Sequence, residues 1–340
     1  MATSYLDDIL DQPRALQATL ESLRLASPIT TIADNLASGK YRQVVLTGMG
    51  SSFAGLYPLQ LRLSALPIGV VRFETAELLH YARELIDPAN LIVAVSQSGE
   101  SAEIIRLLDL VEDQGTVIGI TNTPGSTLAR RSSQPILTNA GDETSVSCKT
   151  YISALAALTW LGDQLLSGPP HFTSLDGVPQ KVADYLSGWR ISVDVLMSKL
   201  AGIQQLFILG RGVSMAAACS GALIIKEAAR FAAEGMNSAA FRHGPIEVIS
   251  PRAFVMVYLG SAATSSLNVT LAQDIRSAGG SVEMVSIAPG PTPFCLPVCP
   301  DPALPILEIL AAQMVSLALA ELQGFEAGRF IHANKITTTE

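Results

Sequence analysis

Four polar side chains lie within six residues, at the point where an apolar run gives way to a helical pattern. The run is "NLIVA", residues 90–94, and the polar side chains are those of Ser96, Gln97, Ser98 and Ser101. Ligands of open α/β sheets bind beyond the carboxyl ends of the strands. Three hydroxyls, one amide and nearby backbone N–H groups provide enough donors to hold a small phosphate without a lysine or arginine. The alternative is that Ser98 or Ser101 caps the helix.

A glycine-rich turn, "TGMGSSFAG", follows an earlier apolar run and begins another helix. Gly48 and Gly50 permit a tight turn and a close approach of the backbone to an anion. A dinucleotide fingerprint would need a third glycine where Phe53 stands, although Glu74 lies at a suitable distance for a ribose contact. We therefore favour a phosphate over a dinucleotide as the ligand of this turn.

Short β-branched and apolar runs alternate with helical stretches, and these elements would position both motifs. The runs comprise residues 42–48, 68–74, 90–96, 115–121 and 134–140, followed by 204–210, 252–260 and 280–288. The alternation predicts βαβ units. We expect an α/β fold in which mostly parallel sheets are flanked by helices, in three layers of the flavodoxin-like or Rossmann-like kind.

A weak internal repeat divides the chain. "VVLTGMGSSFAG" and "LFILGRGVSMAA" share a strand, a Gly-x-Gly turn and a helix of small residues, with Gly48 and Gly210 at matching places. Two copies of one unit are therefore expected. A stretch rich in proline, glycine and serine lies between the copies and is the predicted linker. The expected parts are an N-terminal helical segment, a first unit, a linker and a second unit, at residues 1–33, 34–168, 169–180 and 181–340.

Composition excludes several classes of function. The chain has 340 residues and a formal net charge of −8, with no run of lysine or arginine, so nucleic-acid binding is not expected. The acidic start "MATSYLDDILDQP" is unlike a signal peptide. Two apolar helical segments, residues 153–162 and 306–324, are short or interrupted by Glu308 and Gln313. They predict buried helices and no association with a membrane.

The four cysteines, Cys148, Cys219, Cys295 and Cys299, show no disulfide or zinc framework. Cys295 and Cys299 are close enough in sequence to act as metal ligands, but no further Cys or His pair accompanies them, so ordinary thiols are predicted. We expect no metal and no cofactor. A reducing cytoplasm is the expected location.

The motifs carry a resemblance to a known family. "SQSGES" after a strand, with "GMGSS" one βαβ unit upstream, resembles the sugar isomerase (SIS) domain. From about Asp34 to Glu340 the chain is similar to the tandem-SIS isomerase half of glutamine–fructose-6-phosphate aminotransferase. The resemblance implies that the two loops hold the phosphate of a 6-phosphosugar. The implied phosphate ligands are Ser51, Ser52, Ser96, Gln97, Ser98 and Ser101.

The resemblance also implies three catalytic residues. "IIKEAARFAAEGMNSAAFRHGP" places Glu227 on the family's proton-transfer glutamate, and it places His243 on a ring-opening histidine that enters the site from the neighbouring subunit. The tail "NKITTTE" places Lys335 on the lysine that forms a Schiff base with the ketose. A glutamate and a histidine suit proton transfer, and a lysine suits imine formation. A homodimer is therefore expected, with "EGMNSAAFR" as a loop that carries His243 to its partner.

Each of these residues also has an ordinary explanation. Glu227 beside a lysine is typical of a solvated helix face, His243 before Gly-Pro is typical of a turn, and Lys335 is typical of a terminal tail charge. His80 and His171 are expected on surfaces or loops, and His332 lies close in sequence to Lys335.

A fourth residue of interest, Lys149, lies in "GDETSVSCKTY", a loop that the family also uses at its site. The spacing within this loop is one residue shorter here than in the family.

The chain departs from the synthase in two respects. It lacks a glutaminase domain and a cysteine after Met1, so glutamine is not the expected nitrogen donor. Ser220 and Ile224 stand where the synthase has Glu and Lys. The resemblance therefore extends to stand-alone relatives, namely glucosamine-6-phosphate deaminases and fructosamine-6-phosphate deglycases.

The expected activity is isomerisation at C1/C2 of an amino-sugar 6-phosphate with loss of ammonia, which converts glucosamine 6-phosphate into fructose 6-phosphate. One alternative is deglycation of a 6-phosphorylated Amadori adduct. Another is a non-catalytic sugar-phosphate sensor.

Overall fold

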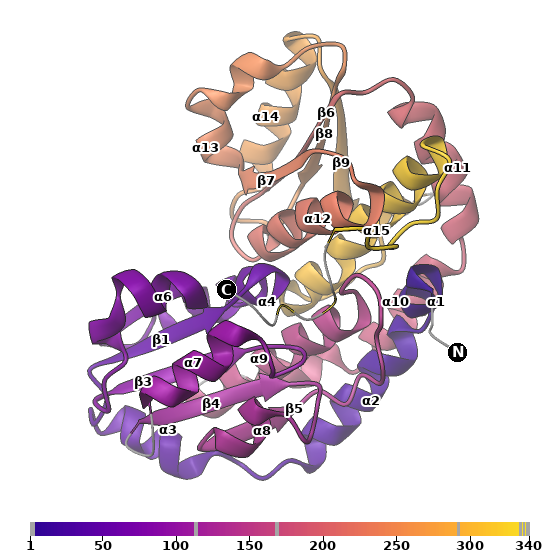
Figure 1. The fold of residues 1–340 in the computed structure, drawn as a ribbon. Helices are drawn as coiled ribbons and strands as arrows, with labels where there is room; N and C mark the ends of the chain where they lie inside the picture. Colours follow the sequence, from indigo (N-terminus) through magenta and orange to yellow (C-terminus); the bar gives the residue numbers. More distant parts are fainter. Residues whose placement is uncertain are drawn as a thin grey trace. The chain divides into compact units, whose positions relative to one another are not determined.

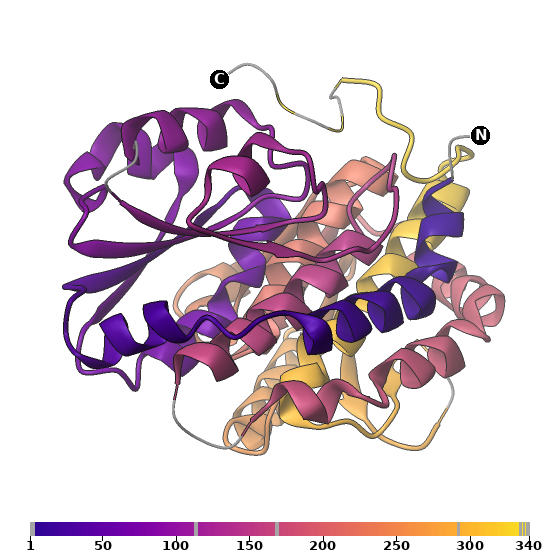
Figure 2. The same cartoon turned by 90° about the horizontal axis from the view of Figure 1, so that it is seen from below.

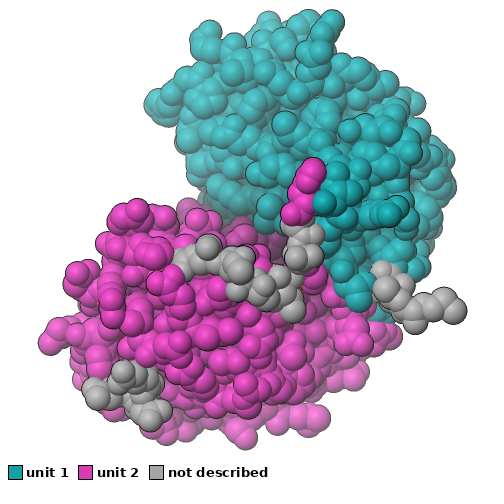
Figure 3. Space-filling model, viewed as in Figure 1, with its two compact units in different colours: residues 1–13, 144–147, 177–331 teal, residues 14–143, 148–176, 332–340 magenta. Residues whose placement is uncertain are grey.

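A computed structural model describes residues 4–111, 115–166, 170–290, 293–332, 335 and 337. The chain forms two compact units, shown in different colours in Figure 3. Unit 2 comprises Arg14–Glu143, Cys148–Asp176 and His332–Glu340. Unit 1 comprises Met1–Pro13, Thr144–Ser147 and Gly177–Ile331. This division differs from the predicted domain boundaries at both ends of the chain, and those boundaries stay a prediction.

Unit 2 contains a five-stranded parallel sheet in the order β2-β1-β3-β4-β5. The strands are β1 (Gln43–Gly48), β2 (Gly69–Glu74), β3 (Asn90–Val95), β4 (Thr116–Thr121) and β5 (Gln134–Leu137). Every residue of β3 is buried. Continuous Val and Ile runs suit strands whose two faces are both covered, which explains why the sequence predicts them well.

Helices cover both faces of this sheet (Figures 1 and 2). The helical elements are α2 (Gln12–Leu25), α3 (Thr30–Ala37), α4 (Gly50–Gly55), α5 (Tyr57–Leu63), α6 (Thr75–Tyr81), η1 (Arg83–Leu85), α7 (Ala102–Val111), α8 (Thr127–Arg131), α9 (Lys149–Leu165) and η2 (Phe172–Leu175). Leu78 of α6, Leu107 of α7 and Leu128 of α8 pack with strand residues in one core cluster. Helices α3, α4 and α5 each pack against α9.

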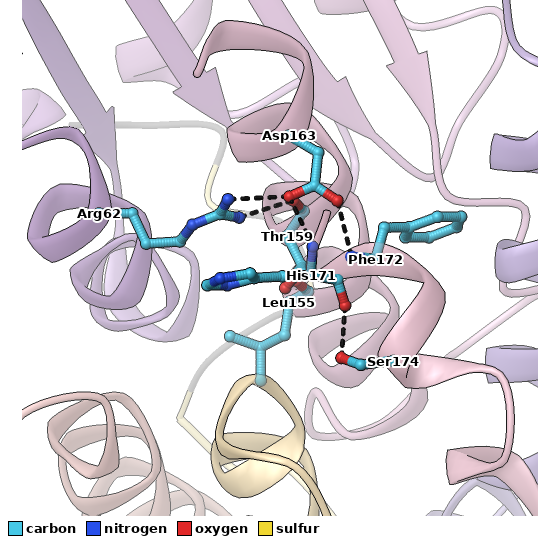
Figure 4. Close-up of polar contacts among 7 residues, drawn as sticks. All are labelled: Arg62, Leu155, Thr159, Asp163, His171, Phe172 and Ser174. Atoms are coloured by element: carbon cyan, nitrogen blue, oxygen red, sulfur yellow. Dashed lines mark hydrogen bonds and ion pairs between the residues drawn. The ribbon is translucent and has the colours of Figure 1, made fainter. Parts of the chain in front are cut away.

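The segment that follows α9 is held in place by one carboxylate, that of Asp163 on α9 (Figure 4). It accepts hydrogen bonds from the backbone N–H of His171 at 3.0 Å and of Phe172 at 2.7 Å. It also pairs with the Arg62 guanidinium at 2.8 Å. The described part of the predicted linker is therefore partly packed structure, because Phe172 is buried and η2 follows.

Unit 1 contains a second five-stranded parallel sheet, in the order β10-β9-β8-β6-β7. The strands are β6 (Gln205–Gly210), β7 (Ala233–Asn237), β8 (Ala253–Tyr258), β9 (Ser281–Ile287) and β10 (Cys295–Leu296). The helical elements are α1 (Tyr5–Leu10), α10 (Val178–Leu186), α11 (Trp189–Leu200), α12 (Ser214–Ala229), α13 (Ser238–Arg242), η3 (Pro245–Val248), α14 (Ser265–Ser277), η4 (Asp301–Ala303) and α15 (Leu304–Leu322). The predicted α/β class with two sheet-and-helix units is confirmed.

The expectation of a loop at residues 234–242 is wrong. This stretch forms most of β7 and all of α13. The sequence does not predict this strand, because "AEGMN" has no β-branched residue. It becomes a strand through its parallel pairing with β6 along one edge of the sheet.

Helix α15 forms much of the core of unit 1. The segment Asp301–Leu322 is long and apolar enough to cross a membrane by length and composition, but its most apolar window is entirely buried in the structure. The prediction of a buried helix is therefore confirmed, and the polar residues Glu308 and Gln313 are buried with it.

The N-terminal segment formed by α1 and the start of α2 packs into the same unit. The Tyr5 hydroxyl lies 3.1 Å from Ser316 Oγ, and the amides of Gln12 and Gln313 exchange hydrogen bonds of 2.8 and 3.0 Å. Tyr5 and Gln12 are buried. The start of the chain is therefore part of the core around α15.

Candidate active site

The two predicted phosphate loops of unit 2 leave adjacent strands at the same edge of the sheet. Gly48 ends β1 and is paired in register with Val95, which ends β3. A Cβ atom at Gly48 would lie 2.9 Å from the carbonyl oxygen of Val95 and 3.2 Å from the Cβ of Ser52. Glycine is required here because the turn and the neighbouring strand approach too closely for a side chain.

The loop after β3 is held in shape by its own side chains. Ser96 Oγ accepts a hydrogen bond from the Gly99 N–H, and Ser98 Oγ accepts one from the Glu100 N–H, each at 3.2 Å. Gly99 has a φ of 66°, and a Cβ there would collide with Ser126. This loop therefore has little freedom to rearrange.

Glu100 ties the same loop to α8. Its carboxylate accepts hydrogen bonds from Thr127 N at 2.6 Å and from Thr127 Oγ1 at 2.9 Å. The only carboxylate within the loop "SQSGES" is therefore engaged by donors of the protein itself.

Several hydroxyls at this edge remain available. Ser51, Ser52 and Ser101 are half-buried, and their hydroxyls have no hydrogen-bond partner among the described residues. Ser98 Oγ accepts its hydrogen bond from Glu100 N, which lies ahead of α7, and Ser101 Oγ has no partner among the described residues. Neither serine side chain therefore caps α7. The structure thus brings all six predicted phosphate ligands to one edge of one sheet, with Gln97 half-buried between its serine neighbours.

The described part of the C-terminal tail lies at the same edge. The carbonyl oxygen of Thr337 accepts a hydrogen bond of 3.2 Å from the N–H of Ala102, the residue after Ser101. Two residues earlier, Lys335 Nζ lies 2.7 Å from Glu143 Oε2, and its side chain is 21% exposed. Lys335 is therefore held in place and is not a solvated terminal charge.

Glu143 is a site residue that sequence analysis missed. Its side chain is fully buried, and it accepts hydrogen bonds from Cys148 N at 2.9 Å and from Thr150 Oγ1 at 2.6 Å in addition to Lys335. The available signal was its place in the loop that precedes Lys149. Lys149 itself is buried as the first residue of α9.

The other two predicted catalytic residues belong to unit 1. Glu227 is half-buried near the end of α12. The next residue, Ala228, accepts a hydrogen bond of 3.0 Å from the Gly328 N–H, which ties the end of α12 to the segment after α15. His243 ends α13, is exposed, and has no hydrogen-bond partner for its ring among the described residues.

The two positions that depart from the synthase lie on α12. Ser220 and Ile224 are completely buried, so this helix carries no charge where the resembled enzyme has Glu and Lys. His80 and His332 are exposed and His171 is half-buried. The four cysteines are free, and no cluster of three potential metal ligands occurs in the described part of the chain.

Both units contain a five-stranded parallel sheet flanked by helices, and the carboxyl edge of the unit 2 sheet has a glycine turn and a hydroxyl-rich loop. These features define a class of α/β proteins that contain two units of the same fold. A family model described as "SIS domain" matches residues 40–162 and 199–291. The chain therefore belongs to the SIS domain family.

Curated relatives and solved structures agree with this assignment. The chain is 29% identical over 351 residues to glutamine–fructose-6-phosphate aminotransferase [isomerizing] of Pyrococcus horikoshii, a match that covers 98% of this chain and 57% of the relative. This chain thus spans little more than half the length of that relative.

Two solved structures show the same fold. The C-terminal domain of glucosamine-fructose-6-phosphate aminotransferase from Francisella tularensis has a TM-score of 0.81 at 19% identity, covering 95% of this chain and 97% of that one. Glucosamine-6-phosphate deaminase from Thermotoga maritima has a TM-score of 0.77 at 20% identity, covering 98% and 99%.

Proposed function

We propose that this protein is an enzyme that processes a 6-phosphosugar, and that it converts glucosamine 6-phosphate and water into fructose 6-phosphate and ammonia without using glutamine. The observation that carries the proposal is the edge of the unit 2 sheet, where serine hydroxyls that have no partner among the described residues occur together with a fixed lysine. The named activities of the aminotransferase relative and of the deaminase with the same fold support the choice of substrate.

The phosphate would be held by neutral donors. The proposed ligands are the side chains of Ser51, Ser52, Ser96, Gln97, Ser98 and Ser101 together with backbone N–H groups of their loops. Hydrogen bonds from neutral donors to an ionised phosphate are charge-assisted and hence stronger than ordinary ones. No metal or cofactor is needed for this step.

Proton transfers then convert the aldose into a ketose derivative. His243 would open the sugar ring by moving a proton between the ring oxygen and the C1 hydroxyl, which exposes the C1 aldehyde. Glu227 would take the proton from C2 and return it to C1. The C2 amine gives up one proton and the C1 oxygen gains one, so the product has an imine at C2 and a hydroxyl at C1.

Lys335 would release the nitrogen. Its amine attacks C2 of the imine, ammonia leaves, and a Schiff base joins Lys335 to the ketose. Water hydrolyses this bond to give fructose 6-phosphate and the free lysine. Glu143 is proposed to hold the Lys335 Nζ at this edge through the 2.7 Å contact.

Ammonia release tests this proposal. Incubation with glucosamine 6-phosphate should yield equal amounts of ammonia and fructose 6-phosphate, and Glu227→Gln should lower the rate by about 10²- to 10⁴-fold. If a fructosamine 6-phosphate is the substrate that turns over, the protein is a deglycase. If sugar phosphates bind and none is converted, it is a sensor.

We further propose that the active unit is a homodimer in which His243 serves the partner's site. The ring of His243 is exposed and makes no hydrogen bond with the described residues, which supports this assignment. Glu227→Gln and His243→Ala homodimers should each be nearly inactive. When the two are unfolded together and refolded, about half the dimers should be mixed, and activity should return to roughly a quarter of the wild-type value. Well-folded mixed dimers without any recovery would show that both residues act in one subunit.

The proposed location is the cytoplasm, where thiols stay reduced. The four free cysteines support this location.

A further inference from the structure

Unit 1 has its own counterpart of the phosphate edge of unit 2. Strand β6 is flanked by β7 and β8, as β1 is flanked by β2 and β3, so the strand order reverses at the same place in each sheet. The turn after β6 contains Gly212, whose φ of 54° equals that of Gly50 in the turn after β1. The crevice at such a reversal is the usual ligand-binding position of an open α/β sheet.

An arginine lies at this edge of the unit 1 sheet. Arg211 follows the last residue of β6, at the position that Met49 has after β1. Its Nε donates a 3.0 Å hydrogen bond to Asn268 Oδ1. Asn268 is completely buried and donates from Nδ2 to the carbonyl oxygens of Tyr258 at 3.0 Å and Leu259 at 3.2 Å. The guanidinium is thereby fixed between the ends of β6 and β8.

The charge of Arg211 is not neutralised by an ion pair among the described residues. Burial lowers the pKa of Arg211, and repulsion from the nearby Arg242 lowers it further. Arg242 itself pairs with Asp274 at 2.5 Å. The terminal N–H groups of the Arg211 guanidinium have no partner in the described part of the chain. A half-buried guanidinium whose terminal N–H groups lack partners among the described residues favours binding of an anion.

The buried carboxyl group close to this turn does not supply the missing negative charge. Glu308 lies against the turn, since it accepts a 2.8 Å hydrogen bond from Ser214, the first residue of α12. Burial raises the pKa of Glu308 to about 8. Glu308 is therefore mostly neutral at pH 7.

Further donors surround the guanidinium at the end of β8. Ser261 and Thr264 are half-buried, and their hydroxyls have no partner among the described residues. Thr264 precedes α14 without capping it, so the first N–H groups of that helix lack a side-chain acceptor. These groups lie on the loop that starts at Leu259 and Gly260, and Asn268 joins this loop to Arg211.

We infer that this crevice of unit 1 is a second anion site that binds a phosphomonoester, with Arg211 as its bidentate ligand and with Ser261 and Thr264 as hydroxyl donors. The planar guanidinium matches two phosphate oxygens, which is the geometry that arginine provides and lysine does not. The inference does not depend on the reaction proposed for unit 2.

Counting bound ligands tests the inference. The full-length protein is titrated with inorganic phosphate and, separately, with glucosamine 6-phosphate, by calorimetry and by phosphorus NMR. Wild type should bind two equivalents of glucosamine 6-phosphate per chain, and Ser98→Ala should weaken one of them. Arg211→Gln should weaken the other by about 10- to 100-fold. If inorganic phosphate alone fills the second site, the site is for the free anion.

Arg252→Gln is the matched control. Arg252 is exposed in the same unit, just before β8. Its substitution by Gln removes the same charge as Arg211→Gln but does so away from the proposed site. It should leave both equivalents in place. Thr264→Glu gives a second test that does not depend on the folding of Arg211→Gln, because it places a negative charge at the mouth of the crevice. The inference is overturned if Arg211→Gln and Thr264→Glu bind both ligands as tightly, and in as many equivalents, as Arg252→Gln.

Discussion

The carboxyl ends of β1 and β3 in unit 2 and of β6 and β8 in unit 1 share a backbone but differ in their side chains. Both edges have a Gly-x-Gly turn whose second glycine has a φ of 54°. Unit 2 presents hydroxyls around this edge and a lysine tail beside it. Unit 1 presents an arginine and two hydroxyls. The backbone at the two edges is therefore alike, and the loops decide which donors each edge would offer to an anion.

The side chains at the two edges also differ in the reactions that they can carry out. An arginine cannot deprotonate in a protein and hence cannot form an imine, whereas a lysine can do so. Beside the edge of unit 2 lies Lys335, held by the buried carboxylate of Glu143 two residues before Thr337, whose carbonyl oxygen contacts the N–H of Ala102. We therefore expect turnover to depend on the edge of unit 2.

The largest expected effect follows from removing that lysine. Lys335→Ala should lower turnover of glucosamine 6-phosphate by at least about 10²-fold, because no amine remains to form the Schiff base. Binding of the 6-phosphosugar should persist. Borohydride added during turnover should trap the ketose on the C-terminal peptide of wild type only, as read by mass spectrometry. An adduct on another lysine would refute the assigned role.

The next effect concerns Glu308 beneath the turn of unit 1. Burial raises its pKa to about 8 from an ordinary value of 4.5. The folded protein then holds a proton that the unfolded chain has lost, so the stabilising contribution is complete below pH 4.5 and is lost as the pH rises to 8. The slope is about 1.4 kcal/mol per pH unit across this interval.

Glu308→Gln isolates this contribution, since the amide oxygen still accepts the Ser214 hydrogen bond. Urea unfolding of both proteins at pH 5.0, 6.5 and 8.0 should show the stability of wild type relative to the variant falling as the pH rises. Parallel pH profiles would contradict the expected ionisation of Glu308.

A smaller effect is expected at the phosphate loop. Ser98→Ala should reduce the affinity for 6-phosphosugars by about 10- to 100-fold, because one charge-assisted hydrogen bond is worth ~1.5–3 kcal/mol. Thermal shift should then show weaker stabilisation by glucosamine 6-phosphate. Glucosamine without phosphate should stabilise neither protein, and equal stabilisation by the two sugars would show that the phosphate is not recognised.

The smallest effect compares the two glycine turns directly. Gly50→Ala and Gly212→Ala each place a side chain at a φ of 54°, which costs roughly 1–2 kcal/mol of unfolding free energy. Gly212→Ala should cost no more than this, because a Cβ there meets open space. Unequal losses in urea unfolding would show that the two turns are less alike than their backbones indicate.

Sequence analysis predicted the fold where the residues themselves have strong preferences. The buried strands of both sheets are continuous apolar runs of residues such as Val, Ile, Leu, Phe and Met, and the buried helix α15 follows from its apolar length. Strand β7 was missed because its residues have weak β preference and its pairing with β6 is a tertiary effect.

In the candidate sites too, local motifs could be read from the sequence, whereas contacts made by folding could not. The two loops proposed to hold phosphate have compact motifs, so their places at the sheet edge followed from the sequence, and phosphate binding stays a prediction. Glu143 was missed as the partner of Lys335 because the two residues are 192 positions apart, and only folding brings them together. Arg211 lies in a motif that sequence analysis used only as evidence for a repeat. Its missing counter-ion is a property of its three-dimensional surroundings.

The packing of α1 has a consequence for synthesis of the chain. Tyr5 and Gln12 make buried contacts with Ser316 and Gln313, partners that are 311 and 301 residues later in the sequence. At ~5–20 residues per second, a ribosome needs roughly 15–60 s to reach these partners. During this interval the apolar face of α1 lacks its native partner, so unit 1 is completed only after α15 has been made, whereas most of the strands and helices of unit 2 are made before it.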